Sequence, residues 1–267
     1  MPVRWPAESI WQQVSPLLPG FTVEILPQID STNSELMRRA RAGQLEPTLL
    51  VAEHQTAGRG RLGRDWQSGG AGSAGHAEAP LAGLTFSLGL QLEPGDWSGL
   101  SLAVGLSVVQ NLHPELMLKW PNDVWLEDRK LAGILIETVS TGEVRYAVIG
   151  IGINVRQRDA SGMRTPPAAL VELLPGIDAP AVLASVVLPL VQAVLRFESH
   201  GFVALREPFH ARDLLYGRAV TCTDGTTGQA RGVDATGALL VHTADGLRKI
   251  TSAEVSVRPS SVPGPLA

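Results

Sequence analysis

The sequence predicts a main domain of mixed helices and strands, followed by a small all-β domain. Up to about residue 212, segments with helical spacing alternate with short apolar runs. From residue 217, short β-type runs alternate with Gly, Asp and Thr turns, which is typical of a β-barrel of about fifty residues. The 267 residues are 44% hydrophobic and 18% charged, enough for a packed domain plus a small one. We assign residues 1–213 to the main domain, 214–260 to the β domain and 261–267 to a tail.

The first predicted helix begins at the motif DSTN, residues 30–33. Ser31 or Thr32 can cap it, Glu35 stands three residues after Thr32 as in a capping box, and Gly43 can end it. Residues 47–55 (PTLLVAEHQ) form a short apolar run that leads into polar residues, which predicts a buried strand. After a loop rich in Gly and Arg, residues 68–80 (SGGAGSAGHAEAP) are of low complexity. We expect them to form a flexible insertion.

The remaining main-domain elements follow from the same patterns. Strands are predicted at residues 84–92, 115–126, 130–139 and 145–155, and a polar turn at 127–129 joins the second to the third. Apolar residues at helical spacing predict a helix within residues 97–112. Residues 180–212 predict two helices divided at Gly201.

Several function classes are disfavoured by composition. The net charge of -4 gives no support for nucleic acid as the main partner, which usually requires a basic face. The single cysteine, Cys222, can form neither an internal disulfide nor a cysteine metal site, and we interpret it as structural. The N-terminal residues lack the apolar stretch of a signal peptide. The longest apolar tract, residues 179–197, is interrupted by Pro189 and Gln192, so we interpret it as a core helix. We expect a soluble, cytoplasmic protein.

Two residue types are scarce, and their positions are informative. Of 22 basic residues only three are lysines, which leaves 22 − 3 = 19 arginines, and there are four asparagines. Lysine offers a compact ammonium where arginine offers a rigid fork, so each lysine is a candidate for specific chemistry. Two lysines and three asparagines fall in five motifs: DSTN, AEHQTAGRGRLGRDW, KWPNDVWL, RKLAGILIE and GIGINV. This concentration favours one shared pocket for anions.

The loop at residues 58–66 (GRGRLGRDW) combines flexible backbone with positive charge. Its glycines allow backbone amides to approach an anion, and Arg59 and Arg61 add forked donors for phosphate or carboxylate. Trp66 offers a flat face to a ring. The loop is not a P-loop, because GxxxxGK[ST] is missing. Taken alone, the composition fits an exposed Arg/Gly linker equally well.

Each of the other motifs has an ordinary structural alternative. Asn122 and Asp123 offer oxygen ligands for Mg²⁺ or a ribose beside Lys119, but Pro-Asn-Asp is also common turn chemistry. Lys130 is the first residue of an apolar strand. Its ammonium can lie at the edge of a pocket, or it can simply be solvated at the strand end. Asn154 ends an apolar strand whose glycines bring the backbone close, and it can simply terminate that strand. The DSTN hydroxyls can serve only as helix caps.

Together, in this order and spacing, the five motifs resemble the biotin–protein ligases (biotin–[acetyl-CoA-carboxylase] ligases), closely over residues 29–155. The resemblance implies an α+β catalytic domain like that of class II tRNA synthetases, with a mixed, mainly antiparallel sheet flanked by helices, and then an SH3-like barrel. It also implies a two-step reaction with biotin and ATP as substrates and Mg²⁺. Biotin is activated to biotinyl-5′-AMP, and its biotinyl group then passes to a lysine of the biotin carboxyl carrier protein.

The resemblance assigns roles to individual residues. The expected biotin-binding residues are Ser31, Thr32, Asn33, Gln55, Arg59, Gly60, Arg61, Lys130 and Gly133. The expected ATP-binding residues are Arg61, Trp66, Lys119, Asn122, Asp123 and Asn154. The expected catalytic residues are Arg59, Arg61, Lys130 and Asp123. Asp123 is in addition the expected Mg²⁺ ligand and the residue that helps the acceptor lysine lose its proton.

The resemblance also frames the expected partners. Some family members carry an N-terminal DNA-binding domain; about 28 residues precede IDSTN here, so we expect a monofunctional enzyme with no DNA partner. No membrane partner is expected, and a homodimer is compatible with the resemblance. Two alternative functions are a lipoate– or octanoate–protein ligase, which shares the catalytic fold, and a non-enzymatic biotin-sensing regulator.

Overall fold

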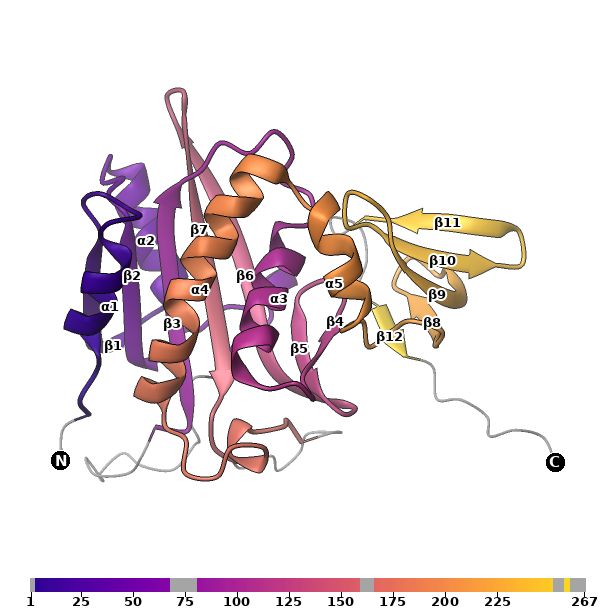
Figure 1. Ribbon diagram of the computed structural model, residues 1–267, viewed down its shortest axis with the longest axis horizontal. Helices are drawn as coiled ribbons and strands as arrows, with labels where there is room; N and C mark the ends of the chain where they lie inside the picture. The colour runs from indigo at the N-terminus through magenta and orange to yellow at the C-terminus, as the bar shows by residue number, and fades with distance from the viewer. Residues whose placement is uncertain (1–2, 68–80, 159–165, 252–256, 260–267) are drawn as a thin grey trace.

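Seven strands form the main sheet, in the order β1-β2-β3-β7-β6-β5-β4 (Figure 1). A computed structural model describes residues 3–67, 81–158, 166–251 and 257–259, so the expected insertion at 68–80 and the tail at 261–267 lie outside the described residues. β1 and β2 are parallel, and every other neighbouring pair is antiparallel. The strands are β1 (Thr22–Ile29), β2 (Thr48–Gln55), β3 (Gly83–Gln91), β4 (Met117–Lys119), β5 (Asp123–Leu126), β6 (Arg129–Thr141) and β7 (Val144–Asn154).

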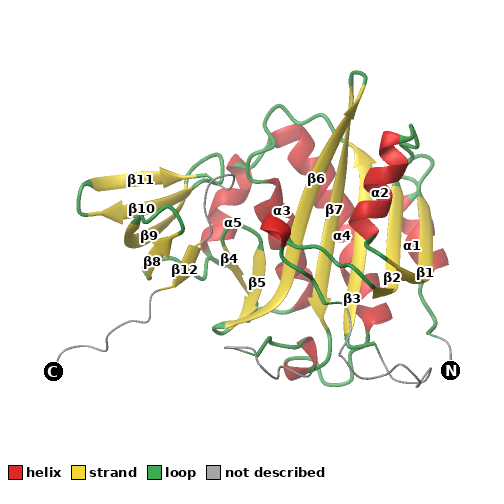
Figure 2. Cartoon of the chain, turned by 180° about the vertical axis from the view of Figure 1, so that it is seen from behind, coloured by secondary structure: helices red, strands yellow, loops and turns green. Residues whose placement is uncertain are grey.

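Helices cover both faces of this sheet. One face carries α1 (Ala7–Val14), α3 (Leu100–Leu112) and α4 (Ala179–His200), and the other carries α2 (Thr32–Arg41), as the two opposite views show (Figures 1 and 2). The short elements are α5 (Arg206–His210) and the 3₁₀ turns η1 (Arg61–Gly63), η2 (Leu170–Glu172) and η3 (Val203–Leu205). The sheet therefore has a heavily covered face and a face that α2 covers only in part.

Alternating strand residues divide the apolar side chains between two cores. On β2, Leu49 and Val51 face the larger core beneath α3 and α4, whereas Leu50 faces the smaller core beneath α2. α4 passes the length and hydropathy test for a membrane span, with a mean hydropathy of 1.8. It nevertheless contributes nine buried residues, and those on its apolar stripe belong to the larger core. The interpretation of residues 179–197 as a core helix is confirmed.

The predicted C-terminal β domain is a five-stranded antiparallel sheet in the order β11-β10-β9-β8-β12. Its strands are β8 (Ala219–Cys222), β9 (Thr227–Val233), β10 (Leu239–Thr243), β11 (Gly246–Ile250) and β12 (Val257–Pro259). The indole Nε1 of Trp120 donates to the carbonyl of Gly237 at 3.0 Å, which ties this sheet to the main domain. Cys222 is buried, and burial raises the pKa of its thiol, in keeping with the structural role predicted for it.

The structure differs from the predicted elements in two places. α1 and β1 were not predicted: α1 spans eight residues and lacks a side-chain cap, and β1 has no regular alternation of burial. The strand predicted at 115–126 is two strands, β4 and β5, paired as a hairpin around a cis Trp120–Pro121 peptide. Pro121 has no N–H to donate to a strand ladder, so the chain turns there.

Candidate active site

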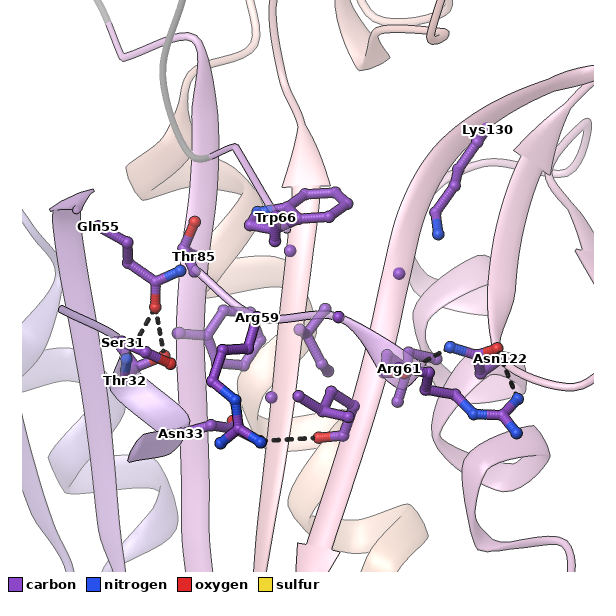
Figure 3. A pocket seen from close by; sticks show the side chains of 18 residues that line it. Ser31, Thr32, Asn33, Gln55, Arg59, Arg61, Trp66, Thr85, Asn122 and Lys130 are labelled. Atoms are coloured by element: carbon purple, nitrogen blue, oxygen red, sulfur yellow. Dashed lines mark hydrogen bonds between the residues drawn. The ribbon is translucent and has the colours of Figure 1, made fainter. Parts of the chain in front are cut away.

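Four chain segments meet on the face of the sheet that α2 only partly covers (Figure 3). They are the start of α2, the loop after β2, the β5–β6 hairpin and the C-terminal half of β7, and β3 adds Thr85 and Phe86 to the lining. Between them lies a hollow of about 450 Å³ that is partly open to solvent. All nine residues expected to bind biotin line it: Ser31, Thr32, Asn33, Gln55, Arg59, Gly60, Arg61, Lys130 and Gly133.

One end of the cavity is neutral, polar and buried. The side chain of Ser31 caps α2, while the backbone N–H and the hydroxyl of Thr32 donate to Oε1 of Gln55 at 2.7 and 3.1 Å. The Ser87 hydroxyl lies 2.7 Å from the Thr32 hydroxyl and 2.6 Å from Oδ1 of Asn33. Ser87 comes from β3 and was missed by the sequence analysis, although the Thr/Ser alternation in that strand marks one polar face. Such a fixed set of hydroxyls and amides suits a polar, uncharged ring.

The Gly150 position on β7 lets Asn33 reach this network. A Cβ at Gly150 would stand 2.1 Å from Oδ1 of Asn33. The amide of Asn33 also donates to the Leu135 carbonyl at 3.2 Å and to Oε2 of Glu137 at 3.1 Å. The glycine and the asparagine predicted from separate motifs are therefore in direct contact.

The side chain of Arg59 is directed to this same end of the cavity (Figure 3). Its guanidinium donates to both carboxylate oxygens of Glu137, at 3.0 and 3.3 Å. Arg59 was expected to close over the biotin carboxylate and the phosphates together with Arg61. The geometry places the two guanidinium groups apart, because Arg61 turns towards Asn122.

The other end of the cavity carries positive charge. Lys130 donates from Nζ to Oδ1 of Asp123 at 2.7 Å. Arg61 donates to Oδ1 of Asn122 at 3.2 Å, and the amide of Asn122 donates to a backbone carbonyl of β6 at 2.7 Å. Burial, the largest cause, lowers the pKa of the Arg61 guanidinium, and the attraction of Asp123 opposes this effect. Cations held in a partly desolvated site are suited to binding carboxylate and phosphate.

Trp66 lies across the sheet between the two strands that carry glycine at matching positions. A Cβ at Gly152 would stand 2.2 Å from Cε2 of the indole. Gly133 is the cross-strand partner of Gly152 on β6, and Lys130 Nζ lies 5.9 Å from the indole centroid. The glycines predicted to bring the backbone close thus make room for one aromatic ring at the cavity wall.

Comparisons with known proteins identify the family of the chain. The model of the biotin/lipoate A/B protein ligase family matches residues 25–154, and that of the biotin protein ligase C terminal domain matches residues 216–258. The bifunctional ligase/repressor BirA of Escherichia coli is 34% identical over 261 residues, covering 92% of this chain and 77% of the relative. The chain belongs to the biotin protein ligase family.

Further relatives support the membership over nearly their whole length. The biotin--[acetyl-CoA-carboxylase] ligase of Paracoccus denitrificans is 31% identical, covering 86% of this chain and 98% of the relative. A solved structure of the biotin protein ligase from Aquifex aeolicus in complex with biotin and ATP superimposes with a TM-score of 0.73 at 31% identity, covering 89% of this chain and 99% of that one. The predicted fold and ligase class are confirmed.

Two further hollows share Trp66 and Lys130 with the first one in this ligase. One, of about 770 Å³, includes Lys119, Asn122 and Asp123 between the loop and the β4–β5 hairpin. The other, of about 620 Å³, lies on the far side of Trp66 and includes Asn154. The residues expected to bind ATP are therefore spread over three adjoining hollows that share Trp66 and Lys130.

Two residues of the hollow that includes Asn154, which we call the outer hollow, were missed by the sequence analysis. Trp125 lies beneath Lys119, whose Nζ is 4.2 Å from its ring centroid. Arg158 lies 5.9 Å from the Trp66 ring centroid, and burial lowers the pKa of its guanidinium. Trp125 belongs to the motif KWPNDVWL, but only the pairing of β5 with its neighbours shows on which face of the sheet its side chain lies. Nothing in the sequence separates Arg158 from the other arginines.

The site offers little for a metal held by protein alone. Among the residues that the structure describes, no group of three His, Cys, Asp or Glu could hold a metal ion. Asp123 brings one carboxylate to the cavity edge, and one of its oxygens accepts from Lys130. A single carboxylate fits Mg²⁺ that arrives already bound to substrate phosphates, which is how this ion is usually held.

Proposed function

We propose that the chain is an ATP-dependent biotin–protein ligase. It activates biotin to biotinyl-5′-AMP with release of pyrophosphate and then transfers the biotinyl group to a lysine of a biotin carboxyl carrier protein. One observation carries the proposal: a single cavity joins a buried, neutral hydrogen-bonding end to a cationic end. Biotin has the same polarity, with an uncharged ureido ring at one end and a carboxylate at the other.

At the neutral end, Ser31, Thr32, Asn33 and Gln55 hold the ureido ring. The hydroxyls and amides there are already ordered by one another, so little conformational entropy is lost when the ring binds. Ser87 fixes the orientation of two of these groups from the sheet. The ring therefore meets preset donors and acceptors, which favours biotin over an acid with an apolar ring.

At the cationic end, Arg61 and Lys130 bind the biotin carboxylate and the α-phosphate of ATP. A carboxylate oxygen of biotin attacks the α-phosphorus, and the bond from that phosphorus to the pyrophosphate oxygen breaks. Negative charge spreads over the phosphoryl oxygens as this happens, and cations already in place stabilise it. Asn122 keeps Arg61 aimed at the reacting atoms.

The nucleotide occupies the hollows around Trp66. The adenine stacks on the indole and meets Asn154 at the strand end, while Lys119 serves the phosphates. Trp125 and Arg158 are further residues of this nucleotide region. Asp123 would be the protein ligand of the Mg²⁺ that accompanies ATP. When bound, the ion neutralises phosphate charge.

In the second step the acceptor lysine nitrogen attacks the carbonyl carbon of the adenylate, the carbon–oxygen bond to phosphate breaks, and AMP leaves. The attacking amine must lose a proton, and we assign this proton to Asp123, whose side chain lines the adjoining hollow beside Lys130. An adenylate also reacts with water, so the loop of residues 58–66 has to exclude solvent over it. We place the reaction in the cytoplasm, with no DNA or membrane partner.

Mass spectrometry after incubation with biotin and MgATP tests the first step. We expect biotinyl-AMP retained on the protein and pyrophosphate release that depends on biotin. Release that responds to lipoate or octanoate but not to biotin would assign the chain to the other branch of the family. The second step is tested with a carrier domain and with the same domain bearing Arg at its acceptor lysine. Only the first should gain biotin.

A further inference from the structure

Glu137, in the middle of β6, contacts two residues that line the neutral end of the cavity, Asn33 and Arg59. Its side chain is 22% exposed. Oε1 accepts from Arg59 at 3.0 Å, and Oε2 accepts from Asn33 at 3.1 Å and from Arg59 at 3.3 Å. A largely buried carboxylate is costly unless it is paired, so these contacts are what make the position tolerable.

The contacts join three segments that are distant in the sequence. Asn33 belongs to the first turn of α2, Arg59 belongs to the loop after β2, and Glu137 belongs to the sheet beneath both. Arg59 also donates to the hydroxyl of Ser34 at 3.4 Å, so the guanidinium lies along the start of the helix. One carboxylate therefore sets the distance between a ureido-binding side chain and the loop that covers it.

Elsewhere the loop is held by its own backbone hydrogen bonds, by the indole of Trp66 on the sheet at Gly152, and by Arg61 at the cationic end. The N–H of Gly60 donates to the Arg64 carbonyl at 2.7 Å, and the N–H of Trp66 donates to the Gly58 carbonyl at 2.9 Å. Arg61 is held at Asn122, at the opposite end of the cavity. The pairing with Glu137 therefore anchors the loop at the ureido end, and it neutralises much of the charge of Arg59 there.

We propose that Glu137 is a positioning residue that anchors the loop over the ureido end through Arg59 and holds the amide of Asn33 towards the ring. Its effect is on biotin retention and loop closure, while the cations at the other end serve the chemistry at phosphorus. This inference rests on the proposed function, because it assumes that biotin occupies the cavity.

Glu137→Gln is the sharpest variant. A glutamine oxygen can still accept from Asn33, but its amide then faces the guanidinium of Arg59, donor against donor. We expect the Kd for biotin alone, measured by calorimetry, to rise about three- to tenfold, as for a charge-assisted pair that is partly exposed. kcat for pyrophosphate release at saturating biotin should stay within about twofold. Trypsin should cleave the loop several times faster, and added biotin should protect it less.

Arg59→Gln breaks the same pair from the loop side and leaves the sheet residue unchanged, so it keeps the test valid if Glu137→Gln folds poorly. The double variant should lose no more biotin affinity than either single variant, because both remove one interaction. Glu24→Gln is the matched control: it removes a comparable partly buried pair, Arg39–Glu24, on α2 and β1. It should change neither Kd nor trypsin cleavage.

Three outcomes overturn the inference. They are an unchanged Kd in Glu137→Gln, a fall in kcat with the KM for biotin unchanged, or additive losses in the double variant. The wild-type protein is assayed alongside for biotinyl-AMP. If it makes none, the proposed function fails, whereas normal wild-type activity with any of the three outcomes removes only the role of Glu137.

Discussion

Gly152→Ala should displace the indole of Trp66 and thereby weaken ATP binding. Gly152 lies in β7, which pairs with β3 on one side and β6 on the other, so its backbone has little freedom to move. An added Cβ would stand 2.2, 2.4 and 2.6 Å from three atoms of the indole. Carbon atoms pack best at about 3.5–4.0 Å, so the ring has to move by about 1.3 Å or more.

The expected loss of ATP affinity is set by the contact that the Trp66 indole is proposed to make with the adenine. The structure places Trp66 between the main cavity and the outer hollow, with Lys130 Nζ 5.9 Å from its centroid. Stacking of a base on an aromatic side chain contributes about 1–3 kcal/mol. Loss of that contact corresponds to a rise in KM for ATP of about five- to hundredfold. Biotin affinity should change much less, because the ureido end does not contact this ring.

The assay is pyrophosphate release at varied ATP with biotin saturating, together with calorimetry of biotin alone. Gly95→Ala is the control, since a Cβ there would meet nothing within 4 Å and the backbone is not left-handed. Thermal melts establish that both variants are folded. The reasoning is refuted if folded Gly152→Ala keeps a normal KM for ATP, because the indole could then move without consequence, or if only biotin binding is lost.

Three further predictions follow. Lys130→Ala should slow biotinyl-AMP formation about 10²- to 10³-fold by removing a cation at the reacting carboxylate, and a normal rate in single-turnover assays would contradict its role. Gly150→Ala should raise the KM for biotin but not for ATP, since its Cβ would stand 2.1 Å from Oδ1 of Asn33. Burial raises the pKa of Asp213 to about 6, above its unfolded value, so its proton stabilises the fold at low pH, and the contribution is lost as pH rises through about 6. Asp213→Asn should therefore raise the free energy of unfolding, measured by denaturant titration, more at pH 7.5 than at pH 4.5, by about 2 kcal/mol. An equal shift at both pH values would contradict this.

The scarcity of lysine and asparagine located the pocket, because side chains with specific partners stand out where their type is otherwise avoided. Lys130, Asn33 and Asn122 all line the main cavity. Asn111, the asparagine outside the five motifs, donates only to a carbonyl one turn back in α3. The apolar patterns and helix caps around the motifs also predicted which motifs lie on strands and which one begins a helix.

Cross-strand register could not be predicted. Glu137 stands seven residues after Lys130 in one strand, and nothing in its neighbours shows that it faces Asn33 across more than a hundred residues. Ser87 is hidden for the same reason. Contacts of this kind depend on which strands pair and in what register, and the order β3-β7-β6 brings together segments that the chain separates.

The composition of the loop also cannot show in which direction each arginine side chain points, because this depends on which partner the folded chain brings near it. Two cations of the cavity, Arg59 and Lys130, contact carboxylates, so part of their charge is balanced before substrate arrives. Arg61 donates to a neutral amide oxygen, and desolvation outweighs the attraction of Asp123 enough to lower its pKa. Of the loop's three arginines, Arg59 contacts Glu137 at the neutral end of the cavity and Arg61 contacts Asn122 at the other end, and this division matches the separate roles that the proposed function gives them.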